Sequence, residues 1–251
     1  IERHLAPMTD LYLAVGTAIA TDLLVRGIAT PGQVRTIGPA VDPAPVVCSP
    51  ASRAEARRRM GVEPAATVVG TVGRLDAQKA PEVLIEALAA MRHTSAVGVW
   101  VGDGPLRQRM EHLAGRHGLA DRMRFLGHRE DAARLLPGFD VFALSSRYEG
   151  LPCAVVEAQQ CGVPVVATAV DGVLDVVSPG ETGLLVPPEA PAALAMALDH
   201  VLDHPVDAAR WVSAARAQLR DRYSTETLAE VLLEAYSPAD VTGSTPRHLH
   251  V

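Results

Sequence analysis

The stretch from Asp140 to Thr168 constrains the fold more than any other part of the sequence. Its apolar run Val141 to Leu144 ends in two serines and predicts a buried strand. Pro152 suits the first turn of a helix, which Gly162 ends before a second apolar run at residues 163–167. The order strand, loop, helix, strand predicts a βαβ unit with two parallel strands in one sheet.

The loop and the start of this helix carry the polar groups of a candidate site. Glu149 precedes the helix and Glu157 lies on it, so both carboxylates can face a ligand at the carboxyl end of the first strand. Unpaired amides at Gly150, Leu151 and just beyond Pro152 favour a phosphate there. A carboxylate beside a phosphate needs hydroxyl donors, and a sugar nucleotide offers both groups. The alternative is that both glutamates are solvated surface charges.

A second strand ending supplies cations. Residues 67–73 form an apolar run that predicts a buried strand ending at Gly73. Arg74 and Lys79 follow five positions apart, and a guanidinium fork together with an ammonium point charge suits a diphosphate. The alternative is a loop that is held by a salt bridge through Asp76.

Strands alternate with helices over the rest of the chain. Six strands within residues 67–186 predict the α/β class, as an open, doubly wound parallel sheet of the Rossmann type. Ligands of such sheets bind at the carboxyl ends of the strands. We interpret Gly102-Asp-Gly-Pro105 as a tight turn at the border of the site. The other expected strands are 10–15, 34–37, 96–101, 123–126 and a last strand that follows a turn within 180–186. The expected helices are 17–26, 52–60, 81–92, 107–117, 189–202, 207–221 and 225–236.

Composition excludes several classes of protein. The 251 residues carry a net charge of -6, whereas a nucleic-acid partner favours a basic chain. No apolar run reaches the roughly 20 residues of a membrane span, which leaves only peripheral membrane association open. The spacing of Cys48, Cys153 and Cys161 is not that of a zinc site, and Cys153 lies too far from Cys161 to bridge it. We therefore expect a reducing, cytoplasmic location and no metal or other cofactor; the sequence also lacks an Asp-x-Asp motif.

The motifs carry a family resemblance. Glu149-Gly-Leu-Pro, Glu157-Ala and Cys161-Gly-Val-Pro-Val-Val-Ala-Thr together resemble the signature of retaining glycosyltransferases of family 4, which have the GT-B fold. The resemblance implies that Glu157 holds the ribose hydroxyls of a nucleotide-sugar donor. It implies that Glu149 contacts the transferred sugar.

Two other segments match the same family. The run Gly73-Arg-Leu-Asp-Ala-Gln-Lys79 is similar to the loop in which an arginine and a lysine neutralise the donor diphosphate. The backbone after the glycine at position 127 commonly contacts the base, so Gly127 and His128 are peripheral candidates. The chain departs from the family at Asp171 and Asp175, which stand where a glycine and a glutamate are usual, and at Gly16, where serine is usual.

The resemblance also implies a division of the chain. Residues 1–42 would be the remnant of an amino-terminal Rossmann domain that holds the acceptor. Residues 43–51 would be a proline-rich linker, residues 52–236 the donor-binding domain and residues 237–251 a flexible tail. Because the chain begins at Ile1, we expect that residues before it are missing.

The implied activity is transfer of a sugar from a nucleoside diphosphate to an acceptor hydroxyl with retention of configuration. Arg74, Lys79 and the helix amides would stabilise the leaving diphosphate, and Glu149 would contact the sugar. A donor phosphate oxygen would take the acceptor proton, so no residue is assigned as general base. The acceptor, whether glycan, lipid or small molecule, is open. The alternatives are a nucleotide-sugar-binding module without turnover and a sugar-nucleotide epimerase of the GT-B fold.

Overall fold

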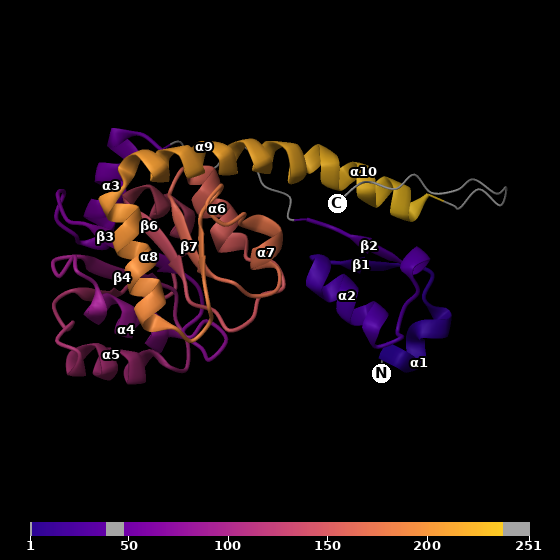
Figure 1. Cartoon of the computed structure of the whole chain (residues 1–251), viewed down its shortest axis with the longest axis horizontal. Helices are drawn as coiled ribbons and strands as arrows, with labels where there is room; N and C mark the ends of the chain where they lie inside the picture. The colour runs from indigo at the N-terminus through magenta and orange to yellow at the C-terminus, as the bar shows by residue number, and fades with distance from the viewer. Residues whose placement is uncertain (1, 39–47, 238–251) are drawn as a thin grey trace.

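The centre of the chain is a six-stranded sheet in which all neighbouring strands run parallel (Figure 1). A computed structural model describes residues 2–38 and 48–237. The strand order β5-β4-β3-β6-β7-β8 is that of a doubly wound sheet. The predicted α/β class and parallel sheet are therefore confirmed. The strands are β3 Val68–Val72, β4 Val97–Val101, β5 Met123–Phe125, β6 Val141–Leu144, β7 Val165–Thr168 and β8 Leu184–Val186.

Helices cover both faces of the sheet, because the strands are apolar on both sides. Val68 and Phe142 pack in one buried cluster, whereas Val69 and Trp100 pack in the other. The first cluster includes residues of α3 Pro50–Met60, α6 Cys153–Cys161 and α7 Val173–Val176; the second includes residues of α4 Pro81–Ala90, α5 Arg107–Arg116 and α8 Pro191–Asp203. The long helix α9, Pro205–Arg222, contributes to both clusters.

The pair β3 and β6 is the place where the strand order reverses. The two strands are neighbours, with Val69 opposite Val141 and Gly70 opposite Phe142, although β4 and β5 lie between them in the sequence. The loops that follow β3 and β6 leave the sheet from the same, carboxyl edge. Sheets of this order bind ligands at that point.

Most predicted boundaries agree with the structure to within a few residues. Helix α6 begins directly after Pro152 and ends at Gly162, whose φ of 88° is left-handed. Helix α3 begins at Pro50 rather than Ser52, because the Ser49 side chain caps it by accepting from the Ser52 amide. Strand β7 begins two residues later than expected, and α7 lies in a segment that was expected to be a loop.

Residues 2–38 form a small unit beside the sheet. Its two strands run parallel. The first turn of its main helix faces the carboxyl edge of the large sheet, where the Thr17 amide donates to Asp175. Helix α10, Thr225–Tyr236, extends from the end of α9 and lies over β2 (Figure 1). The elements are α1 Glu2–Leu5, β1 Tyr12–Ala14, α2 Thr17–Val25 and β2 Val34–Thr36, with 3-10 turns at Ala6–Met8 and Pro31–Gln33.

The predicted division into segments 1–42, 43–51, 52–236 and 237–251 stays a prediction. Residues 39–47 and 238–251, which include most of the proposed linker and the proposed tail, lie outside the described residues.

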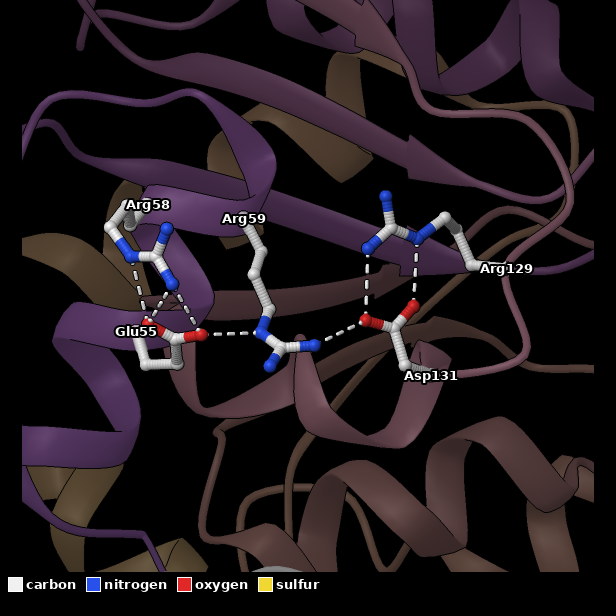
Figure 2. A network of polar contacts seen from close by, with 5 residues as sticks. All are labelled: Glu55, Arg58, Arg59, Arg129 and Asp131. Atoms are coloured by element: carbon white, nitrogen blue, oxygen red, sulfur yellow. Dashed lines mark hydrogen bonds and ion pairs between the residues drawn. The ribbon is translucent and has the colours of Figure 1, made fainter.

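A chain of ion pairs joins α3 to the loop that follows β5 (Figure 2). Glu55 binds Arg58 and Arg59 of the same helix, and Arg59 reaches Asp131 at 2.8 Å. Arg129 donates two hydrogen bonds to Asp131 and holds the pKa of that carboxyl well below its usual range. The segment just after Gly127 and His128 is thereby held against α3.

Asp140, the residue before β6, joins α3 to the start of two strands. Its carboxylate accepts from Arg53 at 2.5 Å, from Arg57 at 2.7 Å and from the Val68 amide at 2.7 Å. Arg57 is only 3% exposed, and another of its nitrogens binds two carbonyls in residues 64–66. Burial lowers the pKa of Arg57, and the Asp140 carboxylate opposes that effect, so the buried charge depends on its partner.

We expect Asp140→Ala to lower the free energy of unfolding by about 3 kcal/mol, because it leaves the buried Arg57 without its counter-charge. Urea unfolding measures the loss. Arg210→Ala is the control, since it removes an exposed ion pair to Asp207 and should change stability by less than about 1 kcal/mol. Losses of equal size in the two variants would contradict this account.

Candidate ligand site at the carboxyl edge of the sheet

The loops after β3 and β6 meet at a buried ion pair. Lys79 Nζ lies 2.6 Å from Glu149 Oε1, and the Ser146 hydroxyl donates to the same oxygen at 2.5 Å. The side chain of Glu149 is 4% exposed and that of Lys79 is 18% exposed. A carboxylate at this depth is stable only with a cation or several donors beside it. The structure therefore brings together two of the predicted site residues, which are 70 positions apart.

Backbone contacts hold the two loops in register. Ser145 donates through its hydroxyl to the Lys79 carbonyl at 2.8 Å, and the Arg147 amide donates to the Gln78 carbonyl at 2.8 Å. The Gln78 side chain returns a hydrogen bond to the Tyr148 carbonyl at 3.1 Å. These contacts fix both ends of the ion pair, so its geometry does not depend on the two side chains alone.

Lys79 is also the single lysine in the sequence; every other residue counted as Lys or Arg is an arginine. An ammonium is a compact charge that moves on a flexible stem, whereas a guanidinium is a rigid planar fork. The one lysine stands where a cation neutralises a buried carboxylate and is itself partly exposed to solvent. The single lysine is therefore itself a signal in the sequence that points to this position.

Arg74 lies at the rim of the site. Its side chain is 74% exposed, and its guanidinium pairs with Asp76 at 2.9 Å. Asp76 also accepts from the Lys79 amide at 3.2 Å. The alternative of a loop that is salt-bridged through Asp76 therefore holds for Arg74, whereas Lys79 turns to Glu149. The structure does not place the two predicted diphosphate ligands together.

The start of α6 offers free amides. Among the described residues, the amides of Gly150, Leu151 and Ala154 donate to no backbone acceptor, and no side chain caps the helix. Gly172, from the loop after β7, donates to the Glu149 carbonyl at 3.2 Å. A Cβ at Gly172 would lie 1.9 Å from the Gly150 carbonyl oxygen, so only glycine permits this approach.

Glu157 lies one turn into α6 with its charge uncompensated. It has no hydrogen-bond or ion-pair partner within residues 2–38 and 48–237. The residue is exposed as a whole, yet the protein atoms around its carboxyl group desolvate it and raise its pKa. Burial also raises the pKa of the nearby Cys153 thiol, and the charges of Glu157, Lys79 and Glu149 all act on it, which places these groups in one neighbourhood. A desolvated carboxylate without a partner, one turn into a helix, makes Glu157 a candidate for contact with a ligand.

Three glycines close the other side of the loops. The Gly73 carbonyl accepts from the Trp100 indole at 2.9 Å, and the Gly102 amide donates to the Gly127 carbonyl at 2.8 Å. A Cβ at Gly102 would lie 2.0 Å from the Gly73 oxygen. The run that begins at Gly102 therefore serves as a tight turn beside the site. His128 follows Gly127 and is exposed, with no partner in the part of the chain that the structure describes.

The segment after β7, which comprises a loop and the short helix α7, contains two acidic residues that the sequence left without a role. Asp171, with a left-handed φ of 32°, accepts from the Glu149 amide at 3.3 Å. Asp175 accepts from the amide of Thr17 at 2.8 Å and from its hydroxyl, and so caps α2 of the small unit. Neither contact could be read from the sequence, because the partners lie 22 and 158 positions away.

The described residues contain neither a cluster of metal ligands nor a helix that could span a membrane. Within residues 2–38 and 48–237 no group of three or more His, Cys, Asp or Glu side chains is arranged to hold a metal ion. In the same ranges no helix combines the length and the apolar character that crossing a bilayer requires.

Comparison with known proteins identifies the family. The family described as "Glycosyl transferases group 1" matches residues 52–218. The chain belongs to this family. The match spans β3 to β8 and therefore contains the ion pair, α6 and the three glycine turns.

Curated relatives of this group 1 chain share one name. A D-inositol 3-phosphate glycosyltransferase of Mycolicibacterium gilvum (strain PYR-GCK) is 39% identical over 205 residues, which are 80% of the chain and 46% of the relative. The protein of the same name from Stackebrandtia nassauensis is 34% identical over 251 residues, which are 95% of the chain and 56% of the relative. The chain thus spans about half the length of these relatives.

Solved structures of related proteins agree in fold. Anabaena Alr3699/HepE in complex with UDP and glucose superposes with a TM-score of 0.85 at 28% identity, over 91% of the chain and 63% of that protein. The same protein has been solved with UDP-glucose. Sucrose-phosphate synthase from Thermosynechococcus elongatus gives a TM-score of 0.78 at 28% identity, over 92% of the chain and 59% of that protein. The GT-B assignment is confirmed by these neighbours.

We expect Glu157→Gln to stabilise the ligand-free group 1 chain at pH 8 by an amount on the order of 0.5 kcal/mol. Because the folded pKa of Glu157 is raised, its ionisation opposes folding once the pH rises above the unfolded value near ~4.3. The difference between variant and wild type should therefore vanish near pH 3. Urea unfolding at both pH values measures it, with Glu230→Gln on α10 as an exposed control. A variant that is less stable than wild type at pH 8 would contradict the raised pKa of Glu157 in the folded chain.

Proposed function

We propose that this chain forms the donor-binding half of a retaining glycosyltransferase, which transfers a sugar from a nucleoside diphosphate to an acceptor hydroxyl. One observation carries the proposal. The buried Glu149–Lys79 pair lies beside the unpaired amides of Gly150, Leu151 and Ala154 and the uncompensated Glu157, at the point where the strand order reverses. Anion-binding and hydroxyl-binding groups thus meet within one loop cluster, which is the combination that a nucleotide sugar requires.

Each part of the donor has a complementary group. Lys79, the amides of Gly150 and Leu151 and, after release from Asp76, the exposed Arg74 would bind the diphosphate. Glu157 would accept hydrogen bonds from the ribose hydroxyls, which would satisfy a carboxylate that has no other partner. Glu149 would face the transferred sugar. The backbone at Gly127 and His128 would border the base.

The diphosphate is proposed to be uridine-linked. The Anabaena protein, 28% identical to this chain, was solved with UDP and with UDP-glucose. The acceptor is proposed to be a phosphorylated cyclitol such as D-inositol 3-phosphate, which rests on the name of the curated relatives alone. That second assignment concerns the whole protein, of which this chain spans about half by comparison with those relatives.

The chemistry depends on charge stabilisation rather than on a base. Negative charge would build on the leaving diphosphate in the transition state. Lys79, the amides of Gly150, Leu151 and Ala154 and, once released from Asp76, Arg74 would stabilise it. The acceptor would attack from the face that the diphosphate leaves, and a donor phosphate oxygen would take its proton. Metal-independent binding is part of this proposal, because side-chain cations and amides supply the positive charge.

Two other functions are distinguished by their products. A binding module without turnover would hold the nucleotide sugar and release it unchanged, and a GT-B epimerase would alter the sugar without an acceptor. The ion pair beside the free amides fits binding in all three cases. The match to group 1 glycosyl transferases favours transfer.

We expect the purified chain to bind UDP more tightly than GDP or ADP, with equal affinity in the presence and absence of magnesium, as measured by calorimetry. Lys79→Ala and Glu157→Ala should each weaken UDP binding about 10-fold or more, because each removes a charge-assisted contact. Arg109→Ala is the control, since it removes an exposed cation from α5.

Glu157→Ala is the cleaner of the two variants, because its side chain makes no contact that the fold needs. Lys79→Ala leaves the buried Glu149 unpaired, so its thermal unfolding is measured alongside binding. Unchanged UDP affinity in a folded Glu157→Ala chain would overturn the site assignment.

A further inference from the structure

Two thiols that are far apart in the sequence lie side by side in the fold. Cys48 Sγ is 3.0 Å from Cys161 Sγ, across 113 positions of sequence. Cys48 precedes the cap of α3 and is exposed, whereas Cys161 is the last residue of α6 and is buried. A disulfide has a sulfur separation of about 2.05 Å, so the two atoms need to approach by only about 1 Å to bond.

We propose that Cys48 and Cys161 form a redox modification site, at which a low-molecular-weight disulfide converts the thiol pair into an intramolecular disulfide. The expectation from the sequence, three reduced and unrelated cysteines, did not consider this pair. No spacing rule could indicate it, because only the packing of the segment before α3 against α6 makes the two thiols neighbours.

The surroundings give the two thiols different roles. The hydrogen bond with Cys161, together with the charges of Arg216 and Arg53, outweighs the effect of burial and lowers the pKa of Cys48 to about 7. The same hydrogen bond and burial raise the pKa of Cys161. Arg216 is held in place by donating to the carbonyls of Gln160 at 3.1 Å and Cys161 at 2.8 Å. An exposed thiol with a lowered pKa is the attacking group, and the buried thiol resolves the product.

The reaction is a thiol–disulfide exchange in two steps. The Cys48 thiolate attacks one sulfur of the small disulfide, which forms a mixed disulfide and releases one thiolate. The Cys161 sulfur, losing its proton to solvent, then attacks the Cys48 sulfur and releases the second thiolate. Two protein thiols are oxidised by two electrons, the small disulfide is reduced to two thiols, and the two protons end on those thiols.

Cys153 provides an internal comparison. It is exposed like Cys48, but it lies at the opposite end of α6, about 12 Å along the helix from Cys161. Burial and the Glu157 carboxylate raise the pKa of its thiol. Both residues are exposed, but the carboxylates and burial outweigh the charge of Lys79 at Cys153, and Cys48 has the second sulfur within reach.

The bond would join the point where the chain enters α3 to the end of the helix that begins the candidate site. A bond across 113 positions lowers the conformational entropy of the unfolded chain strongly. The oxidised form should therefore melt about 5–10 °C above the reduced form. In a cytoplasm, where glutathione keeps most thiols reduced, such a bond forms transiently under oxidising conditions.

The test uses the purified chain and oxidised glutathione as the small disulfide. After incubation, free thiols are blocked and the protein is digested without reduction and analysed by mass spectrometry. We expect a peptide that links Cys48 to Cys161, a blocked Cys153, and a melting temperature that rises and returns to its starting value after reduction. Cys153→Ser should give the same linked peptide and the same reversible rise in melting temperature as wild type.

Variants of the pair separate the proposal from its alternatives. Cys48→Ser changes an exposed residue and should abolish both the linked peptide and the rise in melting temperature, while the chain stays folded. Cys161→Ala should stop the reaction at the mixed disulfide on Cys48. A stable glutathione adduct on Cys48 in wild type, a bond that involves Cys153, or a bond between two chains would each overturn the proposal.

Discussion

The ion pair between Lys79 and Glu149 is the contact on which the candidate site depends. The Glu149 side chain is 4% exposed, and removing one partner of a buried ion pair costs about 3–5 kcal/mol because the other charge is left without compensation. The strand order supplies the geometry, because it makes the loops after β3 and β6 neighbours although 70 residues separate the two side chains. The backbone hydrogen bonds between these loops then keep the pair in place.

Around this satisfied pair, the site leaves other groups unsatisfied. Glu157 is desolvated without a partner, and the amides of Gly150, Leu151 and Ala154 have no backbone acceptor among the described residues. Groups of this kind lower the stability of the ligand-free chain. A ligand that carries both hydroxyls and phosphates would supply the hydrogen bonds that they lack. In the proposed donor complex a diphosphate would compete with Glu149 for Lys79, and the Ser146 hydroxyl would remain as a donor to Glu149.

Local patterns in the sequence predicted the elements of the fold, and long-range contacts could not be predicted in the same way. Pro152 and Gly162 marked the ends of α6 correctly, because both act through the backbone of their own segment. The start of α3 was placed two residues late because the cap at Ser49 was overlooked. The candidate residues of the site were found through their motifs. The contact of Asp175 with Thr17 and that of Cys48 with Cys161 depend on packing between distant segments, and no periodicity encodes them.

The central claim is that Lys79 exchanges Glu149 for a diphosphate. Because Lys79 is the only lysine, a chain labelled with carbon-13 at the lysine ε position gives one side-chain signal by NMR. We predict that saturating UDP shifts this signal strongly, that uridine without phosphates leaves it in place, and that Glu149→Gln shifts it in the absence of any nucleotide. A signal that stays unchanged while calorimetry shows UDP bound would contradict the account.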